Sequence, residues 1–102
     1  MYKVKIIVVC GSGVAMAMHA AYKLRRYLEE QKLFVHIDGS GNNELAGRIN
    51  SYDMVVSNAQ VTVETDKPVF SAIPLITGVG EKELVEKIIA KVKEIQDAKN
   101  TN

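Results

Sequence analysis

The sequence predicts a single-domain α/β fold built on a parallel sheet. Short apolar runs alternate along the chain with longer segments whose apolar residues recur at helical spacing, in the order strand, helix, strand, helix, strand, strand, helix. The first run, Ile6 to Val9, is apolar at every position, which is typical of a strand buried on both faces of a parallel sheet. Helices are therefore expected on both faces.

The first half of the chain supplies two strands and two helices. The first strand is expected at 4–9, and the first helix at 14–31, where one apolar stripe runs from Val14 to Leu28. A short second strand is expected at 33–37. Residues 39–43, Gly-Ser-Gly-Asn-Asn, are interpreted as a loop whose asparagine caps a short helix at 44–50.

The second half supplies two strands and the last helix. A third strand is expected at 53–57 and a fourth at 68–73, with Pro68 at its start, where a missing N–H does no harm. Residues 58–67 contain few apolar residues, and the pattern there fits a short helix, an irregular crossover or a mobile loop equally well. Gly78 and Gly80 turn the chain into a helix that begins at Glu81. The domain is expected to span 1–98, followed by a disordered tail at 99–102.

Composition excludes several classes of function. The 102 residues carry a net charge of +1, whereas a nucleic-acid-binding protein should have a concentrated basic surface, so no nucleic-acid partner is expected. The longest apolar run, at 6–10, is too short to span or insert into a bilayer. One cysteine rules out an internal disulfide framework and suits a reducing cytoplasm. Charged residues 23, 25, 26, 29 and 30 are expected to form a solvated face of the first helix.

The chemistry is expected at that cysteine. Cys10 ends the first strand and is followed by Gly11-Ser12-Gly13 and a helix. Glycines allow a tight turn that exposes backbone N–H groups, and a helix N-terminus attracts anions. The same position is expected to lower the pKa of a thiol. The sequence therefore favours a nucleophile in a phosphate cradle over a buried cysteine that only packs.

Two further loops are expected beside Cys10. In open α/β sheets ligands bind beyond the carboxyl ends of the strands, so the loops after the third and fourth strands converge on the site. Asn58, Gln60 and Thr77 are the polar candidates that this topology brings there. His19 is disfavoured because the helix carries it away from the strand end. His36 is expected to be structural, and neither a metal nor a cofactor is expected.

The residues after Cys10 do not match the known phosphate-binding loops. A nucleotide-binding loop needs Lys-Ser/Thr after its second glycine, and this chain has Val14-Ala15 near that point. Cysteine-dependent phosphatases place an arginine at the sixth position after the cysteine, where this chain has Met16. An Asp-Pro general acid is also absent from the sequence. The loop is therefore predicted to hold a phosphoryl group but lacks the arginine and the general acid that a phosphatase uses for hydrolysis.

At these residues the chain resembles a known family. Residues 9–15, Val-Cys-Gly-Ser-Gly-Val-Ala, and residues 74–81, Pro-Leu-Ile-Thr-Gly-Val-Gly-Glu, are similar to segments of the IIB components of the sugar phosphotransferase system, most closely the galactitol type within the lactose/cellobiose-like family. The resemblance implies a sheet of order 2-1-3-4, as in low-molecular-weight tyrosine phosphatases. It also implies that Cys10 is phosphorylated and that the backbone from Gly11 to Met16, through Ser12, Gly13, Val14 and Ala15, is the cradle.

The resemblance implies partners as well. A IIB component takes its phosphoryl group from a phosphohistidine on a IIA protein and gives it to a sugar or alditol held by the membrane protein IIC. One departure concerns the residues after the loop, where the family often has Ser and Thr and this chain has Met16-Ala17-Met18. Met16 and Met18 either line an apolar rim suited to a protein partner or pack in the core. The departure puts the transfer rate and the partner in question.

Two other hypotheses remain open. One is a phosphatase or arsenate-reductase-like enzyme on the same cradle, which the missing arginine and acid argue against. The other is a thiol-based regulatory module, for which a second, resolving cysteine would be expected.

Overall fold

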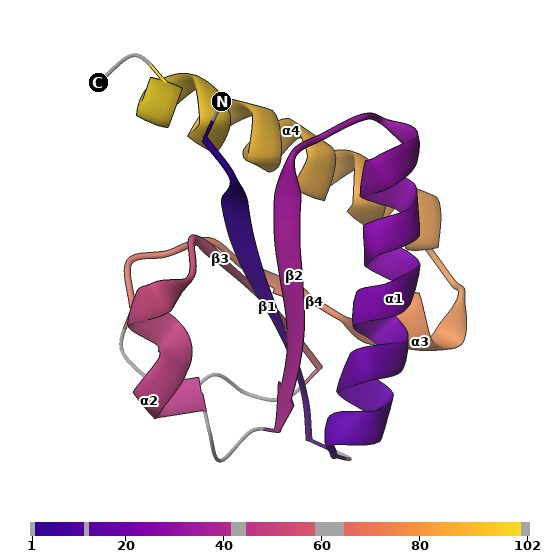
Figure 1. The fold of residues 1–102 in the computed structure, drawn as a ribbon. Helices are drawn as coiled ribbons and strands as arrows, with labels where there is room; N and C mark the ends of the chain where they lie inside the picture. Colours follow the sequence, from indigo (N-terminus) through magenta and orange to yellow (C-terminus); the bar gives the residue numbers. More distant parts are fainter. Residues whose placement is uncertain (1, 12, 42–44, 59–64, 101–102) are drawn as a thin grey trace.

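Four parallel strands form the centre of the structure, a computed structural model that describes residues 2–11, 13–41, 45–58 and 65–100 (Figure 1). The strands are β1 (Val4–Cys10), β2 (Val35–Gly41), β3 (Met54–Ser57) and β4 (Val69–Ser71). Their order in the sheet is β2-β1-β3-β4, and every neighbouring pair is parallel. This confirms the expected α/β class and the expected strand order.

β1 is the strand that positions the site. It pairs along its whole length with β2, so that Cys10 lies opposite Gly41, and on its other side Ile6 to Val9 pair with β3. Six of its seven residues are buried, as its continuous apolar sequence predicts. The thiol therefore stands at the carboxyl end of an inner strand that is paired on both sides.

Helices cover both faces of the sheet, but unequally. One face carries α1 (Val14–Glu30), α3 (Ile73–Thr77) and α4 (Glu81–Asn100), as Figure 1 shows. The other face carries the short helix α2 (Leu45–Arg48) and a 3₁₀ turn, η2 (Ile49–Ser51). The sequence expectation of one short helix at 44–50 is thus corrected to an α-turn followed by a 3₁₀-turn, and residues 42–44 lie outside the described part.

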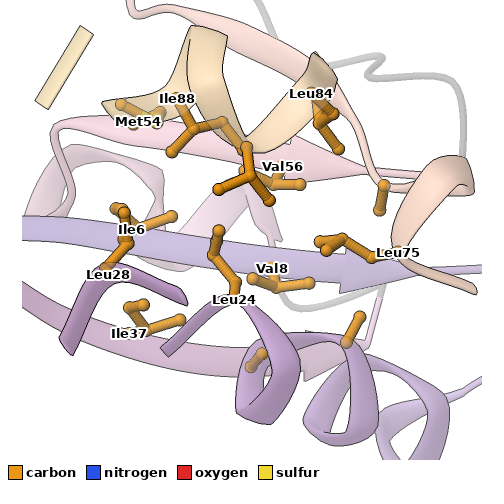
Figure 2. Close-up of a cluster of buried hydrophobic side chains, with 14 of the residues drawn as sticks. Ile6, Val8, Leu24, Leu28, Ile37, Met54, Val56, Leu75, Leu84 and Ile88 are labelled. Atoms are coloured by element: carbon orange, nitrogen blue, oxygen red, sulfur yellow. The ribbon is translucent and has the colours of Figure 1, made fainter. Parts of the chain in front are cut away.

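Alternate residues of β1 face the two cores. Ile6 and Val8 point to the larger core, where they meet Leu24 of α1 and the apolar faces of α3 and α4 (Figure 2). Ile7 and Val9 point to the smaller core under α2 and η2. The buried members of the smaller core are Ile7, Val9, Leu45, Ile49, Tyr52 and Val55.

β2 extends beyond its predicted end. The sequence predicts a strand at 33–37 and a loop from Gly39 onward, whereas the strand runs from Val35 to Gly41. Pairing with β1 holds these residues in the sheet. A Cβ added at Gly39 would lie 2.9 Å from the backbone nitrogen of Met18, so α1 crosses β2 closely enough to require glycine there.

β4 is shorter than predicted, because part of its sequence forms α3. The expected strand at 68–73 is confined to Val69–Ser71, and the helix begins at Ile73. Ser71 Oγ accepts a hydrogen bond from Ile73 N–H at 3.2 Å, and Pro74 stands in the first turn, where a missing N–H is harmless. Gly78 ends the helix in a left-handed conformation, with φ of 83°.

Two polar expectations on the helices are corrected. Lys23 is not part of a solvated face: its ammonium pairs with Glu81 and donates to the Leu75 carbonyl oxygen at 2.9 Å, which ties α1 to the α3–α4 turn. α4 continues to Asn100, two residues into the expected tail, and Asn100 Oδ1 accepts a hydrogen bond from Tyr2 N–H at 2.7 Å.

Within the described ranges, no helix has the length and apolarity needed to cross a membrane.

Candidate functional site at the end of β1

Cys10 and the start of α1 face each other across a short loop. Cys10 is the last residue of β1 and is fully buried, and α1 begins at Val14. Among the described residues no side chain caps α1, and its first turn carries no acidic residue. The first N–H groups of a helix have no partner within it, so α1 directs uncapped donors and the positive end of its dipole toward the loop.

Gly13 gives the loop its shape. Its N–H donates to the Cys10 carbonyl oxygen at 3.2 Å, and its own carbonyl oxygen accepts the first helical bond from Ala17 N–H, also at 3.2 Å. Its φ of 122° lies where other residues are strained. The glycine proposed from the sequence as part of a tight turn therefore closes the turn and starts the helix. Ser12 lies outside the described residues.

Asn58 reaches the loop from the end of β3. Its backbone N–H donates to the Val9 carbonyl oxygen at 3.1 Å, which extends the β1–β3 pairing by one step. Its side-chain oxygen accepts a hydrogen bond from Gly11 N–H at 2.7 Å. The structure thus brings Asn58 to the loop after Cys10, where the topology argument expects it. Gln60 lies outside the described residues.

Thr77 is engaged elsewhere. Its hydroxyl donates to the Ile73 carbonyl oxygen and accepts from Val79 N–H, both at 3.2 Å. Both bonds lie within α3 and the turn that follows it. In the described part of the chain, no hydrogen bond joins Thr77 to the Cys10 loop.

The Cys10 thiol does not have the acidity that the sequence predicts. Burial raises the pKa of the Cys10 thiol, whereas its place before a helix predicts a lowered pKa. Two N–H groups of the loop are already bonded to oxygen, that of Gly11 to Asn58 and that of Gly13 to the Cys10 carbonyl. These donors are not free to stabilise a thiolate, so loss of water dominates.

The three arginines of the chain are all engaged away from the loop. Arg25 donates to the Ile37 carbonyl oxygen at 2.7 Å, and Arg26 lies 5.9 Å from the centre of the Tyr22 ring. Arg48 donates to the Tyr52 hydroxyl at 2.7 Å and pairs with Asp38 at 3.7 Å. No arginine is therefore available as the clamp that a cysteine phosphatase uses.

Apolar side chains at the start of α1 are open to solvent. Met16 is 37% exposed, Met18 60% and Val14 43%. These three residues, called the α1 rim below, follow the loop directly. The rim hypothesis for Met16 and Met18 therefore agrees with their exposure, and the alternative of core packing does not.

The histidines lie outside this arrangement. His19 is exposed on α1, in its second turn. His36 Nε2 lies 2.9 Å from Asp38 Oδ2 on the edge strand β2, where it takes part in a surface ion-pair cluster with Arg48. In the part of the chain that the structure describes, no hydrogen bond or ion pair joins either histidine to the Cys10 loop, and the sequence expectations for both stay predictions.

Comparison with known proteins decides the family. The family model described as the lactose/cellobiose-specific IIB subunit of the phosphotransferase system matches residues 5–94. The chain belongs to this IIB family. The match begins within β1 and ends within α4, so it includes the Cys10 loop and every strand of the sheet.

Individual relatives agree with this assignment. The chain is 28% identical over 86 residues to a protein of Escherichia coli K12 named "Putative phosphotransferase enzyme IIB component SgcB", covering 84% of this chain and 94% of that protein. It is also 28% identical over 88 residues to the galactitol-specific EIIB components of Escherichia coli K12 and Shigella flexneri, covering 85% of this chain and 94% of each. This IIB protein is therefore a component of a sugar phosphotransferase system, a class that works with IIA and IIC partners.

Sequence reasoning missed one side of the site. Gly41 lies opposite Cys10 in the sheet, and a Cβ added there would lie 3.4 Å from Cγ2 of Val14. The composition of Gly39-Ser40-Gly41 is typical of turns, so the sequence predicts a loop there. In the structure the two glycines are two residues apart on β2 and share the face that α1 crosses.

Proposed function

We propose that this IIB protein is a phosphocarrier in which Cys10 takes a phosphoryl group from a phosphohistidine of IIA and passes it to a sugar or alditol bound by IIC. The observation that carries the proposal is the position of the only thiol of the chain, at the end of β1 and before the N-terminus of α1, which no described side chain caps. That position supplies a nucleophile and an anion cradle in one loop.

Both transfers balance with a neutral thiol at rest. In the first, the sulfur of Cys10 attacks phosphorus, the P–N bond of phosphohistidine breaks, and the thiol proton passes to the released imidazole nitrogen. In the second, a sugar hydroxyl oxygen attacks phosphorus, the S–P bond breaks, and the hydroxyl proton returns to the sulfur. The proton that Cys10 gives up in the first transfer is thus recovered in the second.

The proposed cradle is the backbone from Gly11 to Met16. The first helical residues, Val14, Ala15 and Met16, offer N–H groups that no side chain of the described loop caps. N–H donors and a helix dipole hold a phosphoryl group without attacking it. Because the arginines are engaged elsewhere, we prefer a carrier to the phosphatase or arsenate-reductase-like alternative. A thiol-based regulatory role is disfavoured because the sequence has no second, resolving cysteine.

The proposed substrate class is a sugar or alditol of the galactitol type. Support comes from the names of two relatives, which are galactitol-specific EIIB components. The transported molecule is held by IIC, and the IIB protein meets it as a phosphoryl acceptor. We place the carrier in the cytoplasm, where a free thiol stays reduced.

The test is phosphoryl uptake by Cys10→Ser. A IIA protein of a galactitol-type system, charged with radiolabelled phosphate on its histidine, is mixed with either form of the IIB protein. The wild type is expected to take up label and the variant none, because a serine hydroxyl is far less ionised and a weaker nucleophile. Thermal melts of both proteins check that folding is retained. Equal labelling of the serine variant would move the site away from Cys10.

A further inference from the structure

Asn58 occupies a hydrogen-bond donor that a phosphoryl group on Cys10 would compete for. Its side-chain oxygen lies 2.7 Å from the backbone nitrogen of Gly11, the residue that follows Cys10. Backbone N–H groups of a glycine-rich loop are the donors that bind phosphoryl oxygens. In the unphosphorylated protein, the first of these donors is therefore bonded to an amide oxygen.

The backbone of Asn58 is fixed while its side chain can turn. The Asn58 N–H bond to the Val9 carbonyl oxygen anchors the residue to β1 at 3.1 Å. The half-buried side chain ends in two different groups, an acceptor oxygen and an NH₂ with two donors. Gly11 offers only a donor, so the oxygen end must face it in the thiol form.

A phosphoryl group on Cys10 needs hydrogen-bond donors from the loop, whereas in the thiol form the Gly11 N–H needs an acceptor. It carries close to two negative charges and three acceptor oxygens, and it offers no donor to the Asn58 oxygen. The three arginines are engaged elsewhere, and the donors that the described structure places at this loop are neutral N–H groups. The NH₂ group of Asn58 is a side-chain donor of this kind, one rotation away from the Gly11 N–H.

We infer that Asn58 exchanges the two ends of its side-chain amide when Cys10 is phosphorylated. Its oxygen releases the Gly11 N–H to a phosphoryl oxygen, and its NH₂ group donates to the same phosphoryl group. Asn58 is thus a positioning residue that holds the loop in the thiol form and a phosphoryl ligand in the phosphorylated form. The inference rests on the proposed phosphorylation of Cys10.

The first experiment needs no partner protein. Because Cys10 is the only cysteine, the unfolded chain can be converted there to dehydroalanine and then, by addition of thiophosphate, to phosphocysteine. The L form is separated and refolded. Heteronuclear NMR then compares the Gly11 N–H and the Asn58 side-chain NH₂ in the thiol and phosphocysteine proteins. Both signals are expected to shift downfield in the phosphoprotein, and an unchanged Asn58 NH₂ signal would overturn the inference.

The second experiment uses Asn58→Asp, which keeps an oxygen for Gly11 N–H but removes the donor. The Gly11 N–H is expected to keep its protection from hydrogen exchange in the thiol form. Phosphoryl uptake at equilibrium with charged IIA should fall about tenfold or more, because a hydrogen bond to a charged group is lost and a carboxylate repels the phosphoryl group. Asn50→Asp, on the exposed turn η2, adds the same charge elsewhere and should leave uptake unchanged.

The outcomes separate the two proposals. If the wild type takes up no label from IIA, the proposed function fails, and the chemically prepared phosphocysteine protein still tests Asn58. If the wild type and Asn58→Asp take up label equally, the function stands and the exchange of amide ends is wrong. If Asn58→Asp does not fold, the NMR comparison of the two wild-type forms decides the inference.

Discussion

Cys10 experiences two opposing influences at the residue scale. The N-terminus of α1 favours a negative charge, whereas complete burial disfavours it. Burial is the stronger influence, since the pKa of the thiol is raised and the Gly11 and Gly13 N–H groups are bonded to other oxygens. The resting thiol is therefore protonated and shielded from solvent.

The pH dependence of alkylation tests this description of the thiol. The rate of alkylation of the native protein is expected to inflect above the ordinary thiol value of about 8.5, because only the thiolate reacts and burial keeps it scarce. The rate should be followed with iodoacetamide against pH. The same chain in denaturant, where burial is absent, should inflect at the ordinary value. A native inflection at or below the denatured one would contradict the raised pKa.

At this scale the sequence predicts positions better than chemical states. Cys10, Gly13 and Asn58 lie where strand order and turn composition place them, because β1 and β3 are adjacent and both end at the same edge. The direction of the thiol pKa was not predictable in the same way. It depends on which N–H groups are already paired, and that pairing involves residues 47 positions apart in the sequence.

At the scale of elements, the contact between α1 and β2 fixes one side of the site. Gly39 and Gly41 lie under α1, one near the backbone of Met18 and the other near the side chain of Val14. A sequence pattern could not predict this contact, because glycine and serine are typical of turns and an edge strand needs no continuous apolar run. The pairing with β1 and the close approach of the helix explain the strand.

Gly39→Ala tests that contact. The added methyl would meet the backbone of α1 at 2.9 to 3.1 Å, and backbone cannot move aside as a flexible side chain can. Unfolding free energy, measured by urea denaturation, should fall by about 1–3 kcal/mol, the usual cost of overpacking. The matched control is Gly47→Ala in α2, which meets nothing within 4 Å and should be neutral or slightly stabilising. If the two variants have equal unfolding free energies, α1 moves away from the added methyl group without loss of stability, and the predicted overpacking is wrong.

At the scale of the whole molecule, the larger core lies on one face of the sheet, and the candidate site lies at the edge where the strands end. The larger core, between the sheet and α1, α3 and α4, packs α1 against β1 through residues such as Leu24 and Leu28 (Figure 2). Pairing of Lys23 with Glu81 connects α1 to α4 on the same side. The fold thus delivers the loop, the helix N-terminus and the α1 rim to one edge of the sheet, where a partner protein can reach them.

The arrangement of cations predicts how long a phosphoryl group stays on Cys10. The three arginines are engaged away from phosphorus, and among the described residues no acid is bonded to the Cys10 loop to protonate the leaving sulfur, so attack by water is poorly stabilised. Phosphorylated protein, freed from IIA, should keep its label for minutes or longer, and hydrolysis of an aryl phosphate should stay near background. Met16→Arg should strengthen binding of inorganic phosphate without producing turnover, because an arginine supplies a clamp but no acid. Label decay and aryl phosphate release measure the two rates, and rapid repeated turnover by the wild type would favour the phosphatase alternative over the carrier.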